Sequence, residues 1–120
     1  MNKKMASALA AFGFALCIAG PALAHTDLIK SSPAEGASVT PPKTIILTFS
    51  EKVVSAFSGY DLAMDDGRKI AASAATSADG KIVTLSPRGS LMAGGYKLNW
   101  HAASSEDGHR TDGTVSFKVK

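Results

Sequence analysis

Three side chains that can ligate a metal ion lie near the two ends of the expected mature chain: His25, Asp107 and His109. His25 directly follows Ala22-Leu23-Ala24, which has small residues at the two positions that a signal peptidase inspects. Cleavage after Ala24 would make His25 the first residue of the mature protein. A histidine at a free amino terminus can chelate one metal ion through its α-amine and its ring Nδ1 together.

The segment Asp107-Gly108-His109 supplies the other two potential ligands. Alternate residues of an extended segment point the same way, so Asp107 and His109 could direct a carboxylate and an imidazole at one point. Gly108 allows the backbone to approach that point closely. Together with His25 this gives three nitrogens and one oxygen, a tetragonal set that suits Cu(II). By spacing alone, however, Asp-Gly-His in a loop is more often a plain turn, and no periodicity shows that the two ends meet.

The first 24 residues have the organisation of a secretory signal peptide. A positively charged segment, Asn2-Lys3-Lys4, precedes an apolar run at 6–19. This run is too short to span a membrane comfortably. The leader is also the only part of the sequence whose apolar residues follow a helical period. Two alternatives are a retained membrane anchor and a lipoprotein, but Cys17 follows Leu16, where lipidation requires a small residue. We therefore expect residues 1–24 to be a cleaved helical signal peptide and the mature protein to be exported.

Residues 25–120 then form one small domain of 96 residues. Lys3 and Lys4 leave with the leader, so eleven basic residues remain against ten acidic ones, and the net charge falls from +3 to +1. The sequence has no stripe of basic residues of the kind that binds nucleic acid. Cys17, the only cysteine, also leaves, which excludes disulfides and the zinc and blue-copper sites that need cysteine.

Alternating apolar residues and turn signals predict about seven short strands and no long helix in the mature chain. The expected strands lie at 26–30, 44–50, 57–64, 69–76, 81–86, 96–101 and 115–119. Asp79-Gly80 is a hairpin signal, and residues 104–112 are expected to form a polar loop. This pattern predicts an all-β antiparallel sandwich or small barrel of the immunoglobulin-like kind, without a second domain.

The mature sequence resembles the CopC family of periplasmic copper-binding proteins, the group that includes CopC, PcoC and YobA. The resemblance covers essentially the whole mature chain. The combination of a mature-terminal histidine with a late Asp-x-His is specific, whereas the strand segments alone are not. The matching residues are His25 after Ala-Leu-Ala and the segments 32–36, 47–51, 96–100, 107–110 and 113–120.

The resemblance implies a seven-stranded Greek-key sandwich or barrel that binds one Cu(II) per mature chain. Carried over, the ligand roles fall on His25 with its amine, on Asp107 and on His109. The implied function is that of a monomeric copper carrier or buffer in copper homeostasis or resistance, with no catalysis. Its implied partner is an inner-membrane protein of the CopD type, to which it would hand copper.

Two further residues could support the metal site. Glu51 matches a family glutamate that is sometimes placed near Cu(II). It is either a solvated carboxylate at a strand end or a hydrogen-bond acceptor that holds the N–H of a metal-binding imidazole. We favour the second role. His101 alternates with the core-facing residues and lies beside Lys97 and Asn99, so we expect a surface or supporting histidine rather than a ligand.

The methionines depart from part of the family. Some members carry a methionine-rich loop for Cu(I), whereas only Met64 and Met92 remain after the leader, so we expect no separate Cu(I) site. Two other functions stay open. One is an enzyme like the copper monooxygenases with a histidine brace, although we see no aromatic platform for a sugar. The other is a metal-free interaction module of immunoglobulin-like fold.

Overall fold

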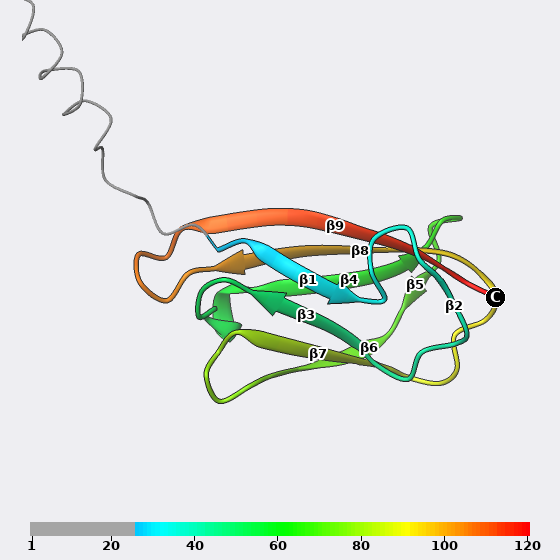
Figure 1. Ribbon diagram of the computed structural model, residues 1–120, viewed down its shortest axis with the longest axis horizontal. Coiled ribbons are helices and arrows are strands. Elements are labelled where there is room, and N and C mark those ends of the chain that lie inside the picture. The colour runs from blue at the N-terminus through cyan, green and yellow to red at the C-terminus, as the bar shows by residue number, and fades with distance from the viewer. Residues whose placement is uncertain (1–25) are drawn as a thin grey trace, which may run out of the picture.

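The computed structural model describes residues 26–120, so the expected signal peptide and His25 lie outside the described residues. Within this range no helix has the length and apolar character needed to cross a membrane. The described chain forms nine strands and one short 3₁₀ helix (Figure 1): β1 (Leu28–Ser32), β2 (Ser38–Val39), β3 (Ile45–Phe49), η1 (Ser55–Phe57), β4 (Gly59–Met64), β5 (Lys69–Ile70), β6 (Ala72–Thr76), β7 (Ile82–Pro87), β8 (Gly94–Ala103) and β9 (Arg110–Val119).

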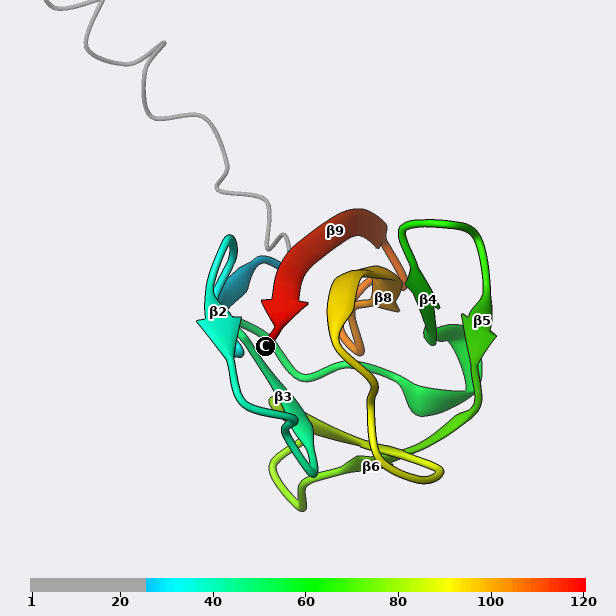
Figure 2. The same ribbon diagram turned by 90° about the vertical axis from the view of Figure 1, so that its right-hand side faces the viewer.

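The strands form two stacked sheets (Figure 2). One sheet has the order β1-β3-β7-β6 and the other has the order β2-β9-β8-β4-β5. All pairs are antiparallel except β2 with β9, which is parallel. The structure thus confirms the all-β immunoglobulin-like sandwich that the sequence predicts.

The core fills the space between the sheets with the residues that alternate along β3, β8 and β9. On β3 the side chains of Ile45, Leu47 and Phe49 are at most 1% exposed. The Phe49 ring meets the Trp100 ring edge to face, with centroids 5.2 Å apart. Gly113 lies opposite Trp100 across β8 and β9, and a Cβ there would come within 2.6 Å of the indole Cε2. The missing side chain therefore makes room for the indole.

The predicted single strand at 69–76 is wrong, because the chain changes sheets within it. Lys69–Ile70 pairs with β4 in the five-stranded sheet, whereas Ala72–Thr76 pairs with β7 in the four-stranded sheet. Ala71 lies between the two strands, and its carbonyl accepts a hydrogen bond from the Arg88 N–H. This crossing helps to close one side of the sandwich.

Several predicted boundaries also move. The first strand is β1 at Leu28–Ser32 rather than 26–30, and β4 begins at Gly59 because the preceding residues form η1. The short strand β2 lies where only turns were expected, since Lys118 and Lys120 donate backbone hydrogen bonds to the carbonyls of Ala37 and Val39. β9 begins at Arg110, so the polar loop before it is shorter than 104–112.

Candidate metal centre

The loop that carries Asp107 and His109 is the tight connection between β8 and β9. The last residue pair of β8 and β9 before the loop is Ala103 with Arg110. Within the loop, the Ser104 N–H donates a hydrogen bond to the His109 carbonyl (3.0 Å). The Gly108 N–H donates to the Ser104 carbonyl (2.9 Å), and Gly108 has a φ of 73°. This left-handed conformation is one that glycine adopts without steric cost, which explains its place between the two candidate ligands.

Asp107 and His109 are linked by a hydrogen bond within this loop. The Asp107 carboxylate accepts the His109 backbone N–H through Oδ1 (2.9 Å), and both residues are exposed. The expectation of an extended segment at this point is wrong, because Asp107 lies in a turn. The two residues are held near each other by an aspartate turn rather than by strand alternation.

The described chain begins at the same end of the sandwich as this loop (Figure 1). Thr26 is fully buried, and the following residue, Asp27, is held from both sides by Ser50. The Asp27 N–H donates to Ser50 Oγ (2.9 Å), and the Ser50 N–H donates to the Asp27 carbonyl (2.8 Å). His25 is adjacent to Thr26 in sequence but lies outside the described residues, so its role as a ligand stays a prediction.

Glu51 lies in the segment between β3 and η1, which contacts both the start of the described chain and the β8–β9 loop. It directly follows Ser50, and the next residue, Lys52, accepts a backbone hydrogen bond from the Ser105 N–H (3.0 Å). Glu51 itself is partly exposed. Its backbone is therefore fixed between the two places from which ligands are expected, although its contact with a metal stays a prediction.

His101 lies on the outer face of the five-stranded sheet, as its alternation with Trp100 predicts. It is opposite Gly59 on β4 and Asp112 on β9, and its ring occupies the space that a side chain at Gly59 would fill. Asp112 in turn accepts a hydrogen bond from Arg110 Nε (2.9 Å). His101 thus packs against the sheet surface beside a charged pair.

The structure brings Asp107 and His109 together but does not supply a third ligand from the described chain. Within residues 26–120, no three histidine, cysteine, aspartate or glutamate side chains are grouped so that they could hold a metal ion. Neither Glu51 nor His101 therefore completes a three-residue group with them. His25, the remaining ligand that the sequence predicts, lies outside this range.

Buried polar atoms gather near the same end of the sandwich, which the sequence did not indicate. Four side chains have a buried polar atom without a hydrogen-bond partner among the described residues: Thr26, Tyr60, Trp100 and Thr111. Tyr60 pairs with Trp100 in the sheet, and burial raises the pKa of its phenol. Such atoms are commonly satisfied by internal water.

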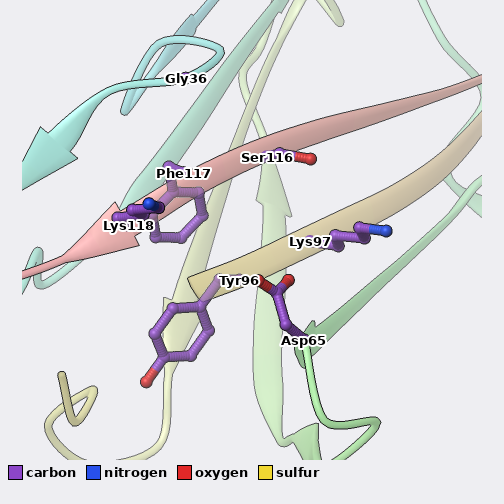
Figure 3. A pocket seen from close by; sticks show the side chains of 7 residues that line it. All are labelled: Gly36, Asp65, Tyr96, Lys97, Ser116, Phe117 and Lys118. Carbon is purple, nitrogen blue, oxygen red and sulfur yellow. The ribbon is translucent and has the colours of Figure 1, made fainter. Parts of the chain in front are cut away.

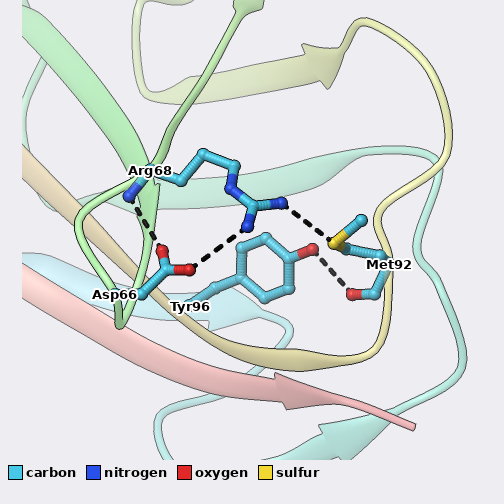
Figure 4. A network of polar contacts seen from close by, with 4 residues as sticks. All are labelled: Asp66, Arg68, Met92 and Tyr96. Carbon is cyan, nitrogen blue, oxygen red and sulfur yellow. Dashed lines mark hydrogen bonds and ion pairs between the residues drawn. The ribbon is translucent and has the colours of Figure 1, made fainter.

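Met92 lies in a network of polar contacts with Arg68 and Tyr96 (Figure 4). Met92 Sδ accepts a hydrogen bond from Arg68 Nη1 (3.4 Å), and Arg68 also pairs with Asp66. The Met92 carbonyl accepts the Tyr96 hydroxyl (2.7 Å). Met64 packs against the core. Met92 is thus part of a polar network that joins the β4–β5 turn to the start of β8.

A shallow hollow of about 150 Å³ opens next to the β4–β5 turn (Figure 3). Its lining includes Asp65 from the β4–β5 turn and Lys97 and Lys118 from the outer face of the five-stranded sheet. The hollow lies along β8 and β9, away from the loop that joins them. It therefore belongs to a different part of the surface from Asp107 and His109.

Comparison with known proteins gives consistent matches. A CopC domain matches residues 28–120. Copper resistance protein C of Xanthomonas campestris pv. juglandis is 42% identical over 106 residues, which cover 82% of this chain and 83% of that protein. Copper resistance protein C of Pseudomonas syringae pv. tomato is 40% identical over 116 residues, which cover 91% of this chain and 91% of that protein.

The fold agrees with these matches. The crystal structure of PcoC, a methionine-rich copper resistance protein from Escherichia coli, superposes with a TM-score of 0.75 at 38% sequence identity. The similarity covers 81% of this chain and all of that one. Because the domain match spans most of the chain and the relatives are similar over nearly their full length, this protein belongs to the CopC family.

Proposed function

We propose that the mature protein binds one Cu(II) ion in the periplasm through His25, Asp107 and His109. The observation that carries this proposal is the convergence of the start of the described chain and the Asp107–His109 loop at one end of the sandwich (Figure 1). The similarity to copper resistance proteins supports copper as the metal. Cleavage after Ala24 would release the α-amine that the site needs.

The donor set fits Cu(II) on chemical grounds. His25 would supply its α-amine and ring Nδ1, His109 an imidazole nitrogen and Asp107 a carboxylate oxygen. Nitrogen and oxygen donors in a tetragonal arrangement suit Cu(II), which is also the strongest binder among the divalent first-row metals. Asp107 Oδ1 accepts the His109 N–H, and we assign the metal to Oδ2, the other oxygen of the same carboxylate. We expect no separate Cu(I) site, since soft thioether ligands would have to come from only two methionines.

The proposed role is that of a copper carrier or buffer in copper homeostasis or resistance. The protein would act as a monomer without catalysis and would pass copper to an inner-membrane protein of the CopD type. Exposed ligands at the end of a rigid sandwich favour such a transfer, because a partner's ligands can reach the metal without opening the fold. Asp107 and His109 both meet this condition, since they are exposed.

The decisive experiment compares the mature protein, beginning at His25, with a variant that carries one extra glycine before it. The extension converts the α-amine of His25 into a peptide amide, so we expect Cu(II) affinity to fall by at least about tenfold, the lower end of the effect of losing a supporting metal contact. Competition titration with a chromophoric copper chelator measures the affinity. Equal affinity of the two proteins would exclude the amine as a ligand.

A control variant with one extra residue after Lys120 should bind copper as the mature protein does, because that residue ends the chain beyond β9. Mature protein that does not bind Cu(II) at all would contradict the proposed function itself. In that case the metal-free interaction module would be the remaining candidate of those that the sequence suggests.

A further inference from the structure

We propose that Ser50–Val54 is a strap that fixes the start of β1 and the Asp107–His109 loop relative to each other, with the Ser50 hydroxyl as its positioning group. This inference deepens the proposed function and rests on it, because the strap would set the distance between the two sources of copper ligands. Ser50 is not itself proposed as a ligand. Its role is to hold the backbone that leads into His25.

The first end of the strap holds the beginning of the described chain. Ser50 makes two hydrogen bonds with the backbone of Asp27: one through its N–H, at 2.8 Å, and one through its hydroxyl, at 2.9 Å. The second bond extends the contact beyond the ladder of β1 and β3, whose last pair is Leu28 with Phe49. Asp27 is therefore held on both its N–H and its carbonyl, two residues after His25.

The other end of the strap holds the loop. The Lys52 carbonyl accepts the Ser105 N–H (3.0 Å), and the Val54 N–H donates to the Ala103 carbonyl (2.9 Å). Between these two bonds, Val53 forms an antiparallel bridge with Ser104. The contacts thus engage the three residues with which the chain leaves β8 and enters the loop.

The strap is itself anchored in the core. Val53 is only 4% exposed, and its N–H donates to the Gly80 carbonyl (2.9 Å). Gly80 is buried with a φ of 76°, and a Cβ there would collide with the stem of the Lys52 side chain. The glycine thus lets Lys52 cross the β6–β7 turn closely. A segment fixed at three places moves little relative to the sheets.

Glu51 is the only residue between Ser50, which holds the start of the described chain, and Lys52, which holds the loop. The two segments from which the copper ligands are expected are therefore connected through a very short piece of backbone. Binding sites gain affinity when their ligands are held in place before the metal arrives. Loss of the Ser50 hydroxyl removes one of the two bonds to Asp27 and leaves the loop side of the strap intact. The start of the chain would then move relative to Asp107 and His109.

The test uses the mature protein with Ser50→Ala, which removes the hydroxyl, and Ser50→Thr, which keeps it. Ser73→Ala, an exposed serine on β6, is the matched control. In the metal-free protein we expect Ser50→Ala to speed amide hydrogen exchange at Asp27 by about fivefold, the equivalent of one hydrogen bond. Exchange at Ser105 should stay unchanged, since its acceptor is the Lys52 carbonyl.

With copper, we expect Ser50→Ala to weaken Cu(II) affinity by about threefold to tenfold and to change the electron paramagnetic resonance spectrum of the bound ion. Ser50→Thr should restore both, and Ser73→Ala should match the parent. If the parent binds copper and Ser50→Ala leaves affinity, spectrum and Asp27 exchange unchanged, the strap proposal is wrong while the proposed function stands. Equal losses in Ser50→Ala and Ser50→Thr would likewise contradict a role for the hydroxyl.

Discussion

Asp107 has two carboxylate oxygens, and the loop already uses one of them. Oδ1 accepts the His109 N–H and so shapes the turn, which leaves Oδ2 for the metal in the proposed site. The same side chain would therefore have two roles, one structural and one in copper binding. A substitution that keeps the hydrogen-bond acceptor but removes the charge can separate them.

Asp107→Asn is that substitution. The asparagine carbonyl oxygen can still accept the His109 N–H, so we expect the loop and the stability of the protein to be preserved. The group left for the metal becomes a neutral amide, and Cu(II) affinity should fall by at least about tenfold, because even outer partners of a metal ligand contribute that much. Competition titration measures the affinity, and thermal unfolding of the metal-free protein checks the fold. Unchanged affinity would show that Asp107 only shapes the loop.

At this scale, the sequence predicts residue types better than it predicts their local geometry. Asp107 and His109 were recognisable because both are metal-ligating residues on either side of a glycine. The choice between a turn and an extended segment could not be made, because an aspartate that bonds its backbone has the same spacing as one in a strand. Ser50 had no signal, since a serine at a strand end looks like any other boundary residue until the fold brings Asp27 beside it.

At the scale of elements, strands with one strongly apolar face were predictable and small-residue strands were not. β3, β8 and β9 follow the expected alternation closely because their inner residues are large and buried. The segment at 69–76 is rich in alanine, so its pattern could not reveal that β5 and β6 belong to different sheets. The two-residue strand β2 is held by backbone hydrogen bonds to β9. Such bonds do not depend on the side chains, so no pattern of residues predicts them.

The β6–β7 hairpin provides a prediction at this scale. Asp79 Oδ1 accepts hydrogen bonds from the Ser77 hydroxyl and from the Lys81 N–H, and the Ser77 bond is the main cause that lowers the pKa of this carboxyl below 3.8. A lowered pKa in the folded protein stabilises the fold above the unfolded value. This stabilisation is lost as the pH falls through the folded value.

We therefore expect the parent to be more stable than Asp79→Asn at neutral pH, and the difference to shrink as the pH falls below 3.8. Because the side chain is exposed, the effect should be small. Urea unfolding of the metal-free proteins at a series of pH values measures it. Asp61→Asn, an exposed carboxylate on β4, is the control. A stability difference that is independent of pH would contradict the assignment.

At the scale of the whole molecule, the two sheets are held together by a core in which aromatic rings meet across and along the layers. Phe49 from one sheet contacts Trp100 from the other, and the Tyr96 and Phe117 rings stack with centroids 5.4 Å apart. These aromatics were predictable as core residues from their alternation. Their packing partners, including Gly113, were not, because register between strands decides which residue lies opposite which.

Gly113→Ala tests this packing. The new Cβ would press on the Trp100 indole, so we expect the free energy of unfolding to fall by about 1–3 kcal/mol, the usual cost of overpacking a core. Urea unfolding followed by the fluorescence of Trp100, the only tryptophan of the chain, measures it directly. Lys118→Ala on the exposed face of the same strand should change stability by less than about 0.5 kcal/mol. Equal stability of parent and Gly113→Ala would show that the indole has room to move.

The direction of β9 has a practical consequence for any study of metal transfer. β9 starts at the Asp107–His109 loop and runs its ten residues to the opposite end of the sandwich (Figure 1), a length of about 30 Å. A protein tethered to a bead or an electrode through Lys120 would therefore present its candidate copper end to the solution. A tether at the amino terminus would instead block the α-amine of His25 and give an immobilised protein without its proposed chelate.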